Sequence, residues 1–105
     1  VPLIADISTY EEGLRAAELG ADIVATTLSG YTQYTEDLAD DFPDFNLIER
    51  LAAEIHVPVI AEGRIWTPGE AAHAMKCGAY AIVVCSAITR PRRITERFVH
   101  TIKSL

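Results

Sequence analysis

The sequence predicts an α/β fold made of four βα units of a (βα)8 TIM barrel, with parallel strands and the helices on the outer side. Three observations predict it: four short apolar runs alternate with four helical patterns, the apolar runs contain no polar alternation, and the chain repeats itself. Uniformly apolar strands are typical of parallel sheets that helices cover. Four units make half of a barrel, so residues 1–105 are expected to form one half-barrel domain.

The first unit begins with a strand pattern at residues 3–5, which Asp6 ends. A helical pattern follows and stops at Gly20; Ser8 precedes Glu11 by three residues, the spacing of a capping box. The chain opens directly on this strand without a Met. Because natural domains seldom begin inside a strand, we expect an amino-terminal truncation.

The second unit has a strand pattern at residues 23–27, a long polar loop at 29–43 and a helix that begins near Asp44. The apolar residues of this helix recur every three or four positions, as in an amphipathic helix: Leu47, Ile48, Leu51 and Ile55. The acidic residues of the loop lack the spacing and glycine of a calcium-binding loop. The sequence therefore predicts no metal site.

The third strand pattern covers residues 57–61 and ends at Glu62, and Thr67 is the expected N-cap of the next helix. The fourth strand pattern covers 81–84, and the last helix is expected to begin near Pro91. The apolar side chains of that helix are expected to be buried: Ile94, Phe98, Val99 and Ile102.

The repeat relates the first and third units. V-P-L-I-A-D at 1–6 matches V-P-V-I-A-E at 57–62, and T-x-x-E at 9–12 matches T-x-x-E at 67–70. The second copy carries two extra residues within 63–66. The alternative is chance likeness between two βα units, but the matched strand motif is longer than such units usually share.

Two acids occupy equivalent places in the repeat. Asp6 and Glu62 each follow a strand directly, at the carboxyl end where parallel α/β proteins collect their functional residues. Two carboxylates that face one pocket suit proton transfer or the orientation of sugar hydroxyls. We therefore predict Asp6 and Glu62 as catalytic residues; the alternatives are that either one caps the next helix or pairs with Arg64.

The loops after the third and fourth strands are candidates for phosphate binding. They contain Gly63 and Arg64, and Cys85 and Ser86. The last two loops of a TIM barrel often bind phosphate through backbone N–H groups, and Gly63 lets the backbone come close. Arg64 or Arg90 could add a charge-assisted contact to the anion.

Composition excludes several classes of partner. The chain has 9 Lys and Arg against 15 Asp and Glu, a net charge of −6 and a pI near 4.9, which argues against a nucleic-acid or anionic-membrane surface. No apolar run approaches the roughly 20 residues of a membrane helix. The two cysteines form no disulfide framework and no signal peptide is visible, so the expected location is the cytoplasm.

Four strand-end motifs in register resemble the N-acetylmannosamine-6-phosphate 2-epimerase family. They are A-D-I-S-T-x-E-E-G at 5–13, T-T-L-S-G-Y-T at 26–32, V-P-V-I-A-E-G-R-I at 57–65 and A-I-T-R-P at 87–91. The resemblance implies a (βα)8 barrel of bacterial sialic-acid catabolism. Such an enzyme interconverts N-acetylmannosamine 6-phosphate and N-acetylglucosamine 6-phosphate by inverting C2, with no redox cofactor and no required metal.

The resemblance also implies roles for individual residues. Asp6 and Glu62 would contact the sugar, Gly63 and Arg64 would lie at the substrate, and Arg90 would hold the phosphate together with the loop at 85–86. The family usually has Gly where this chain has Cys85, and a side chain there could crowd the phosphate loop.

The lysine that transfers the proton in this family lies on an earlier strand, so this chain would be the carboxyl-terminal half of such a barrel. Lys76 and Lys103 lie on helices and cannot replace that lysine. We expect the isolated chain to be inactive, and to self-associate as a homo-oligomer or to require an amino-terminal half. Two alternatives stay open: another sugar-phosphate aldolase or isomerase barrel, and a non-catalytic phosphate-binding module of flavodoxin-like strand order.

Overall fold

The computed structural model describes residues 1–38 and 41–105, so Asp40 of the acidic loop lies outside the described residues. Its single sheet contains four parallel strands: β1 (Ile4–Asp6), β2 (Ile23–Ala25), β3 (Val59–Glu62) and β4 (Ala81–Val83). The strands lie side by side in chain order, β1-β2-β3-β4. This order is that of a half (βα)4 barrel; a flavodoxin-like order would exchange the first two strands, and is wrong for this chain.

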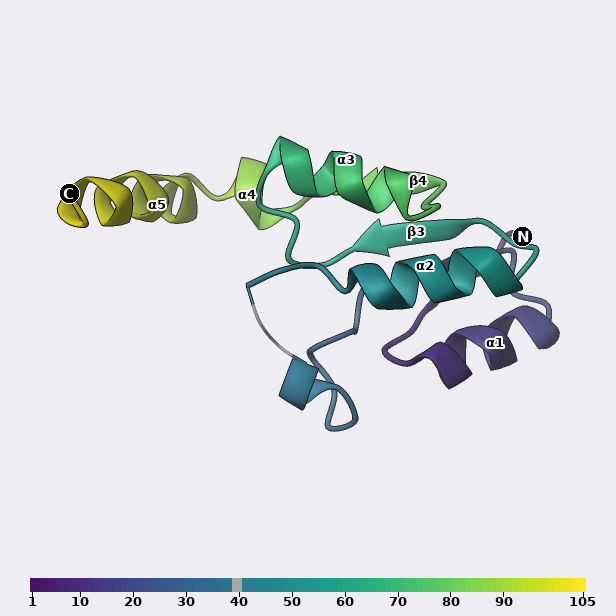
Figure 1. Ribbon diagram of the computed structural model, residues 1–105. Helices are drawn as coiled ribbons and strands as arrows, with labels where there is room; N and C mark the ends of the chain where they lie inside the picture. The colour runs from purple at the N-terminus through teal and green to yellow at the C-terminus, as the bar shows by residue number, and fades with distance from the viewer. Residues whose placement is uncertain (39–40) are drawn as a thin grey trace.

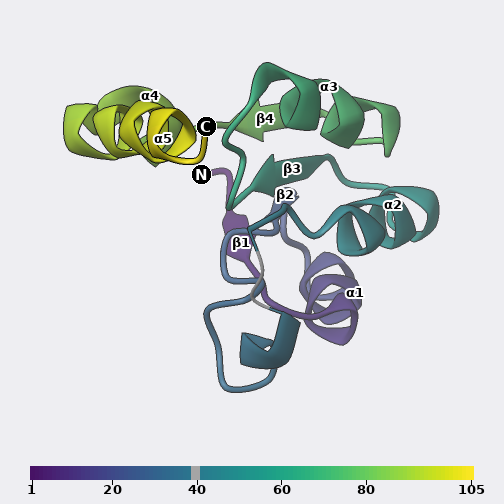
Figure 2. The same cartoon turned by 60° about the vertical axis from the view of Figure 1, so that its left-hand side comes forward.

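The helices of the first three units cover one side of the sheet. They are α1 (Tyr10–Glu18), α2 (Phe45–Glu54) and α3 (Pro68–Lys76). Figure 2 shows all three on the same side of the strands, as on the outside of a barrel. A short 3-10 helix, η1 (Glu36–Leu38), lies in the long loop before α2, and α4 (Ser86–Thr89) leads into α5 (Pro91–Lys103). No helix among the described residues has the length and apolar character needed to cross a membrane.

Three side chains cap the helices α1, α2 and α3. Thr67 is the N-cap of α3, as the sequence predicts, and Asp44, near which the sequence predicts the start of α2, is the N-cap of that helix. The prediction that Ser8 caps α1 is wrong, because Thr9 is the N-cap: its hydroxyl accepts the Glu12 N–H at 3.1 Å. Ser8 instead donates its N–H and its hydroxyl to the Glu12 carboxylate, at 2.6 and 2.9 Å. Sequence spacing alone missed the cap by one residue.

The Glu12 carboxylate is therefore partly buried and well bonded. Burial raises the pKa of Glu12, but hydrogen bonds from the backbone and hydroxyl of Ser8 and from the Thr9 N–H outweigh burial and hold the pKa below its ordinary value of 4.5. The ionised form of Glu12 thus stabilises the start of α1.

The core lies between the sheet and the three covering helices, and α2 joins its two parts. One cluster consists of Ile7, Val24, Leu47, Leu51 and Val59. The other consists of Ile48, Ala61, Ile65, Ala74 and Ala79. Ile48 and Leu51, both on α2, are almost fully buried, one in each cluster. The amphipathic pattern of α2 thus fixes the first and third units to one another.

The other side of the sheet is more open. Ile4 and Asp6 at one edge and Val83 at the other are exposed, whereas Ala5 between the first two is half-buried. Side chains alternate between the two faces of a strand, so this open face corresponds to the inside of a barrel. The carboxyl ends of the strands, including Asp6 at the end of β1 and Glu62 at the end of β3, are accessible from this open face.

Helix α5 differs from the sequence prediction. Phe98, Val99 and Ile102 are 68%, 41% and 64% exposed, so the expectation that they are buried is wrong; Ile94 is half-buried. The cause is position: Figure 1 shows α5 extending beyond the end of the sheet, with no strand beneath it. The helix forms from its own amphipathic sequence, but in the described chain its apolar side remains largely uncovered.

Candidate active site

The carboxyl ends of three neighbouring strands bring Asp6 and Glu62 together. Asp6 is the last residue of β1 and Glu62 the last residue of β3, and β2 lies between them. Thr27, two residues beyond β2, has its hydroxyl oxygen 2.9 Å from Asp6 Oδ1 and 2.9 Å from Glu62 Oε2. The two carboxylate oxygens are therefore no further apart than twice that distance.

Thr26 fixes the backbone of Glu62. Its hydroxyl donates to the Glu62 carbonyl oxygen at 3.1 Å and accepts the Glu62 N–H at 3.2 Å. Thr26 is buried, and its own N–H donates to the Ile60 carbonyl at 3.1 Å. These bonds continue the β2–β3 ladder to its end, so Glu62 is held at its backbone by Thr26 and at its carboxylate by Thr27.

A cavity of about 190 Å³ opens beside Glu62. Five of the seven residues predicted for the site line it: Glu62, Gly63, Arg64, Cys85 and Ser86. Thr27 lines it as well. The structure thus assembles the loops after β3 and β4 around one acid, whereas Asp6 reaches that acid only through Thr27.

The segment after β3 turns sharply where it lines this cavity. Gly63 has φ +113° and Arg64 has φ +58°, and the latter is the only non-glycine residue with positive φ among those described. A side chain in this left-handed region stores strain of about 1 kcal/mol or more, and such strain is often found at functional sites. The Arg64 Nη2 donates to the Ser29 carbonyl at 3.4 Å, and a Cβ on Gly30 would come within 3.1 Å of the guanidinium carbon. The cation is thus held against the loop after β2, at the wall of the cavity.

Cys85 and Ser86 stand where β4 passes into α4. Cys85 is exposed, and its carbonyl accepts the Thr89 hydroxyl at 2.8 Å. The Cys85 side chain lies at the cavity wall rather than in the core.

The family model described as "Putative N-acetylmannosamine-6-phosphate epimerase" (NanE) matches residues 1–104. The chain belongs to this family. It is 61% identical over 101 residues to the protein of Caldanaerobacter subterraneus subsp. tengcongensis named "Putative N-acetylmannosamine-6-phosphate 2-epimerase", a match that covers 96% of this chain and 42% of that protein. The chain thus spans less than half the length of that curated relative.

Solved structures of similar proteins match the fold. The N-acetylmannosamine-6-phosphate 2-epimerase of Clostridium perfringens superposes with a TM-score of 0.89 and 51% identity, over 95% of this chain and 43% of that one. The (S)-3-O-geranylgeranylglyceryl phosphate synthase of Thermoplasma acidophilum, in complex with sn-glycerol-1-phosphate, superposes with a TM-score of 0.59 and 25% identity, over 83% and 32% of the two chains. The four-strand sheet of this chain is therefore an arrangement that larger enzymes contain.

In this NanE-family chain Arg90 lies apart from the acid pair. It lines a separate hollow of about 530 Å³ at the start of α5, together with Arg92, Arg93 and Glu96. Arg92 and Arg93 pair with Glu96 at 2.9 and 3.8 Å. The structure does not bring Arg90 to the cavity beside Glu62.

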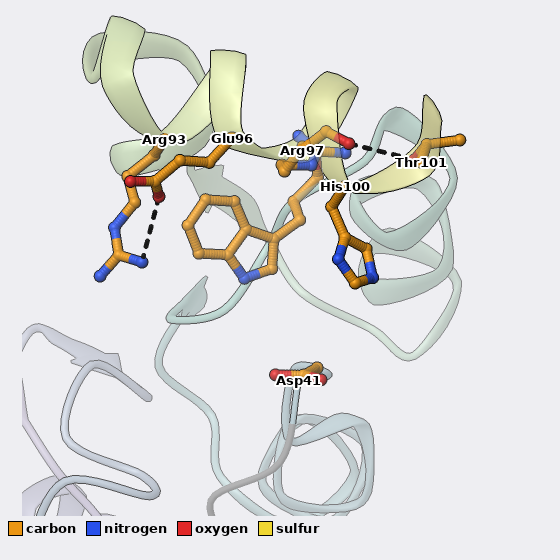
Figure 3. Close-up of a pocket in the computed structure, with 7 residues that line it drawn as sticks. Asp41, Arg93, Glu96, Arg97, His100 and Thr101 are labelled. Carbon is orange, nitrogen blue, oxygen red and sulfur yellow. Dashed lines mark hydrogen bonds and ion pairs between the residues drawn. The ribbon is translucent and has the colours of Figure 1, made fainter. Parts of the chain in front are cut away.

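A third hollow, of about 460 Å³, lies between α5 and the segments around Asp41 and Trp66. Figure 3 shows Arg93, Arg97 and His100 projecting from α5 on one side of it, with Asp41 on the other. Arg97 is exposed and donates to the Trp66 carbonyl at 3.1 Å, so this arginine connects α5 to the β3–α3 loop.

Thr26 and Thr27 are the site residues that sequence reasoning missed. Both are β-branched and follow an apolar run, so the sequence places them in the strand pattern at 23–27. The signal that could have found them is their place, since a pair of hydroxyl residues at the carboxyl end of the middle strand lies between the two predicted acids.

Proposed function

We propose that this chain is the carboxyl-terminal half of a (βα)8 barrel that interconverts N-acetylmannosamine 6-phosphate and N-acetylglucosamine 6-phosphate by inverting C2. The observation that carries the proposal is the pair Asp6 and Glu62, joined through Thr27 at the strand ends of a chain that matches the epimerase family over residues 1–104. The strand order and the open inner face support the assignment to half of a barrel.

Inversion at C2 requires a proton to be removed and returned, and the acid pair can assist this proton exchange. When the sugar ring opens, the aldehyde at C1 acidifies the hydrogen on C2; removing that proton and returning one to the opposite face inverts the centre. A carboxyl group at the strand ends can take or deliver a proton. It can also bind the sugar hydroxyls and so orient C2 toward the group that removes its proton. We assign these roles to Glu62, which lines the cavity, and a supporting role to Asp6.

The phosphate of the substrate fits the two loops beside Glu62. Gly63, Arg64, Cys85 and Ser86 all line the same cavity, and Arg64 supplies a cation. The T. acidophilum synthase, which has a similar fold and was solved in complex with sn-glycerol-1-phosphate, supports a site for a phosphorylated ligand in such a fold. Arg90 joins this site only if the segment that carries α4 and α5 takes another position in the whole barrel.

A hybrid enzyme tests the proposal. Residues 1–105 replace the matching segment of the C. perfringens epimerase, to which they are 51% identical, and the hybrid and the 105-residue chain are assayed for conversion between the two sugar phosphates. We expect the hybrid to be active and the 105-residue chain to be inactive, because the family's proton-transferring lysine lies on an earlier strand. A folded hybrid without activity would contradict the proposed function, and turnover by the chain alone would contradict the half-barrel assignment.

The remaining partners and the location follow from the same proposal. The substrate is a small amino-sugar phosphate, in the cytoplasm, and the open edges of β1 and β4 favour pairing with an amino-terminal half or with a second copy. Sedimentation of the 105-residue chain tests this directly. A well-folded monomer at all concentrations would count against pairing between copies.

A further inference from the structure

One hydroxyl serves two carboxylates at the strand ends. The Thr27 oxygen is 2.9 Å from Asp6 Oδ1 and 2.9 Å from Glu62 Oε2, both within hydrogen-bond distance. A hydroxyl has a single proton to donate but two lone pairs with which to accept. Thr27 can therefore donate to only one carboxylate at a time, and the other contact is complete only when that carboxyl group carries a proton and donates it to Thr27.

The backbone holds Thr27 firmly in this place. The N–H of the preceding residue, Thr26, donates to the Ile60 carbonyl at 3.1 Å, and the N–H of the following residue, Leu28, donates to the Ile7 carbonyl at 3.1 Å. Thr27 is thus anchored on one side to β3 and on the other to the segment that follows β1. The strand ladder therefore places the Thr27 backbone between the two acids.

We propose that Thr27 is a positioning residue that joins Asp6 and Glu62 into one proton-sharing unit and directs Glu62 into the cavity. When one carboxylic acid gives up its proton, its O–H bond breaks and a new O–H bond forms at the Thr27 oxygen, while the original Thr27 O–H bond breaks and its proton bonds to the other carboxylate. The number of protons is unchanged, and no other reactant is needed. This inference rests on the proposed function for its catalytic meaning, but the hydrogen-bond unit can be tested without turnover.

The first test uses the hybrid enzyme described above. We expect Thr27→Val to lower kcat at least tenfold while KM changes by less than about threefold, and Thr27→Ser to restore kcat to within about threefold of the parent. Thr95→Val, the same change at an exposed position on α5, is the matched control and leaves kcat unchanged. A kcat for Thr27→Val within about twofold of the parent would overturn the inference.

The second test uses the 105-residue chain, with ¹³C-labelled carboxyl carbons followed by NMR as the pH is lowered. The other titratable or charged groups that line the cavity beside Glu62 are Tyr31, Arg64 and Cys85, and all the variants retain them. We expect the Glu62 signal to respond to protonation of Asp6 in the parent and in Thr27→Ser, and to lose that response in Thr27→Val.

Independent titration of the two carboxyl groups in the parent chain would overturn the inference even if the hybrid is active. Coupled titration that depends on Thr27 would support the inference even if the hybrid has no epimerase activity. Failure of the proton-sharing unit and failure of the proposed function can thus be told apart.

Discussion

The first and third βα units begin their helices in the same way. In each, a threonine hydroxyl accepts the N–H of a glutamate three residues later at 3.1 Å, in Thr9 with Glu12 and in Thr67 with Glu70. In each, the glutamate carboxylate accepts the N–H of the residue before the cap at 2.6 Å. The repeated T-x-x-E motif therefore has a repeated structure.

The two units differ between the acid and the cap. Two residues separate Asp6 from Thr9, whereas the four residues 63–66 separate Glu62 from Thr67. The longer connection contains the left-handed pair Gly63 and Arg64, and only this unit contributes an acid to the cavity. The same cap therefore begins the helix in both units, while the longer connection with Gly63 and Arg64 occurs in the unit whose acid lines the cavity.

The largest expected difference between the two units is in the loss of kcat when their acids, Asp6 and Glu62, are replaced. In the hybrid enzyme, Glu62→Gln is expected to lower kcat about 100-fold to 10,000-fold, the range for a general acid–base group, and Asp6→Asn only about tenfold. The reason is that Glu62 lines the cavity while Asp6 reaches it through Thr27. Steady-state kinetics of both variants check this; an equal or larger loss for Asp6→Asn would reverse the assignment of roles.

Gly13 and Gly78 both pack against α2, and their replacement by alanine is expected to lower the free energy of unfolding by different amounts. A Cβ on Gly78, after α3, would meet the Ala52 Cβ at 2.7 Å, and Gly78 has φ +105°. A Cβ on Gly13, in α1, would meet the flexible end of Leu51 at 2.5 Å. We expect Gly78→Ala to lower the free energy of unfolding by about 2 kcal/mol. Gly13→Ala is expected to cost less, because Leu51 can rotate and alanine favours a helix. Urea unfolding of both variants measures the order, and the reverse order would refute it.

The two caps are expected to be equivalent. Thr9→Ala and Thr67→Ala should each lower the free energy of unfolding by about 1 kcal/mol, because each removes one acceptor for an N–H at a helix start. Thermal unfolding followed by circular dichroism compares them. If one substitution had no effect while the other did, the structural likeness of the two units would not extend to their energetics.

The smallest effect concerns the charge on Glu12. Its pKa is lower in the folded chain than its ordinary value of 4.5, so the charge stabilises the fold above that pH and this contribution disappears as the pH falls through the lowered pKa. Glu12→Gln should therefore cost about 0.5 kcal/mol at neutral pH and nothing in strong acid. Urea midpoints of the parent and the variant across this pH range check the sign. A difference that grows as the pH falls would contradict it.

Much of this fold could be predicted from the sequence because its signals are local. The apolar strands, the helix start near Asp44 and the cap at Thr67 all depend on neighbouring residues, and the structure agrees with them. The exposed side of α5 could not be predicted in this way, because amphipathic spacing tells which side is apolar and not whether anything covers it.

The candidate site was predictable only in part. Their strand-end positions predict Asp6 and Glu62 as site residues, and the structure brings both within hydrogen-bond distance of one hydroxyl. The bridging role of Thr27 depends on the register of three strands, which the sequence does not state. For Arg90 the prediction and the structure differ. The T-R-P motif predicts Arg90 at the phosphate, whereas in the structure it lines a separate hollow at the start of α5.

The paired start signals at Thr9 and Thr67 have a consequence for engineering. Each of these units contains a strand, an acid at the carboxyl end of that strand and a threonine that caps the following helix, all within about twenty consecutive residues. Such a unit can be transferred as one segment. Grafting the third unit, with its longer loop, in place of the first should install a second left-handed turn and a second cavity wall without redesign of the adjoining helix.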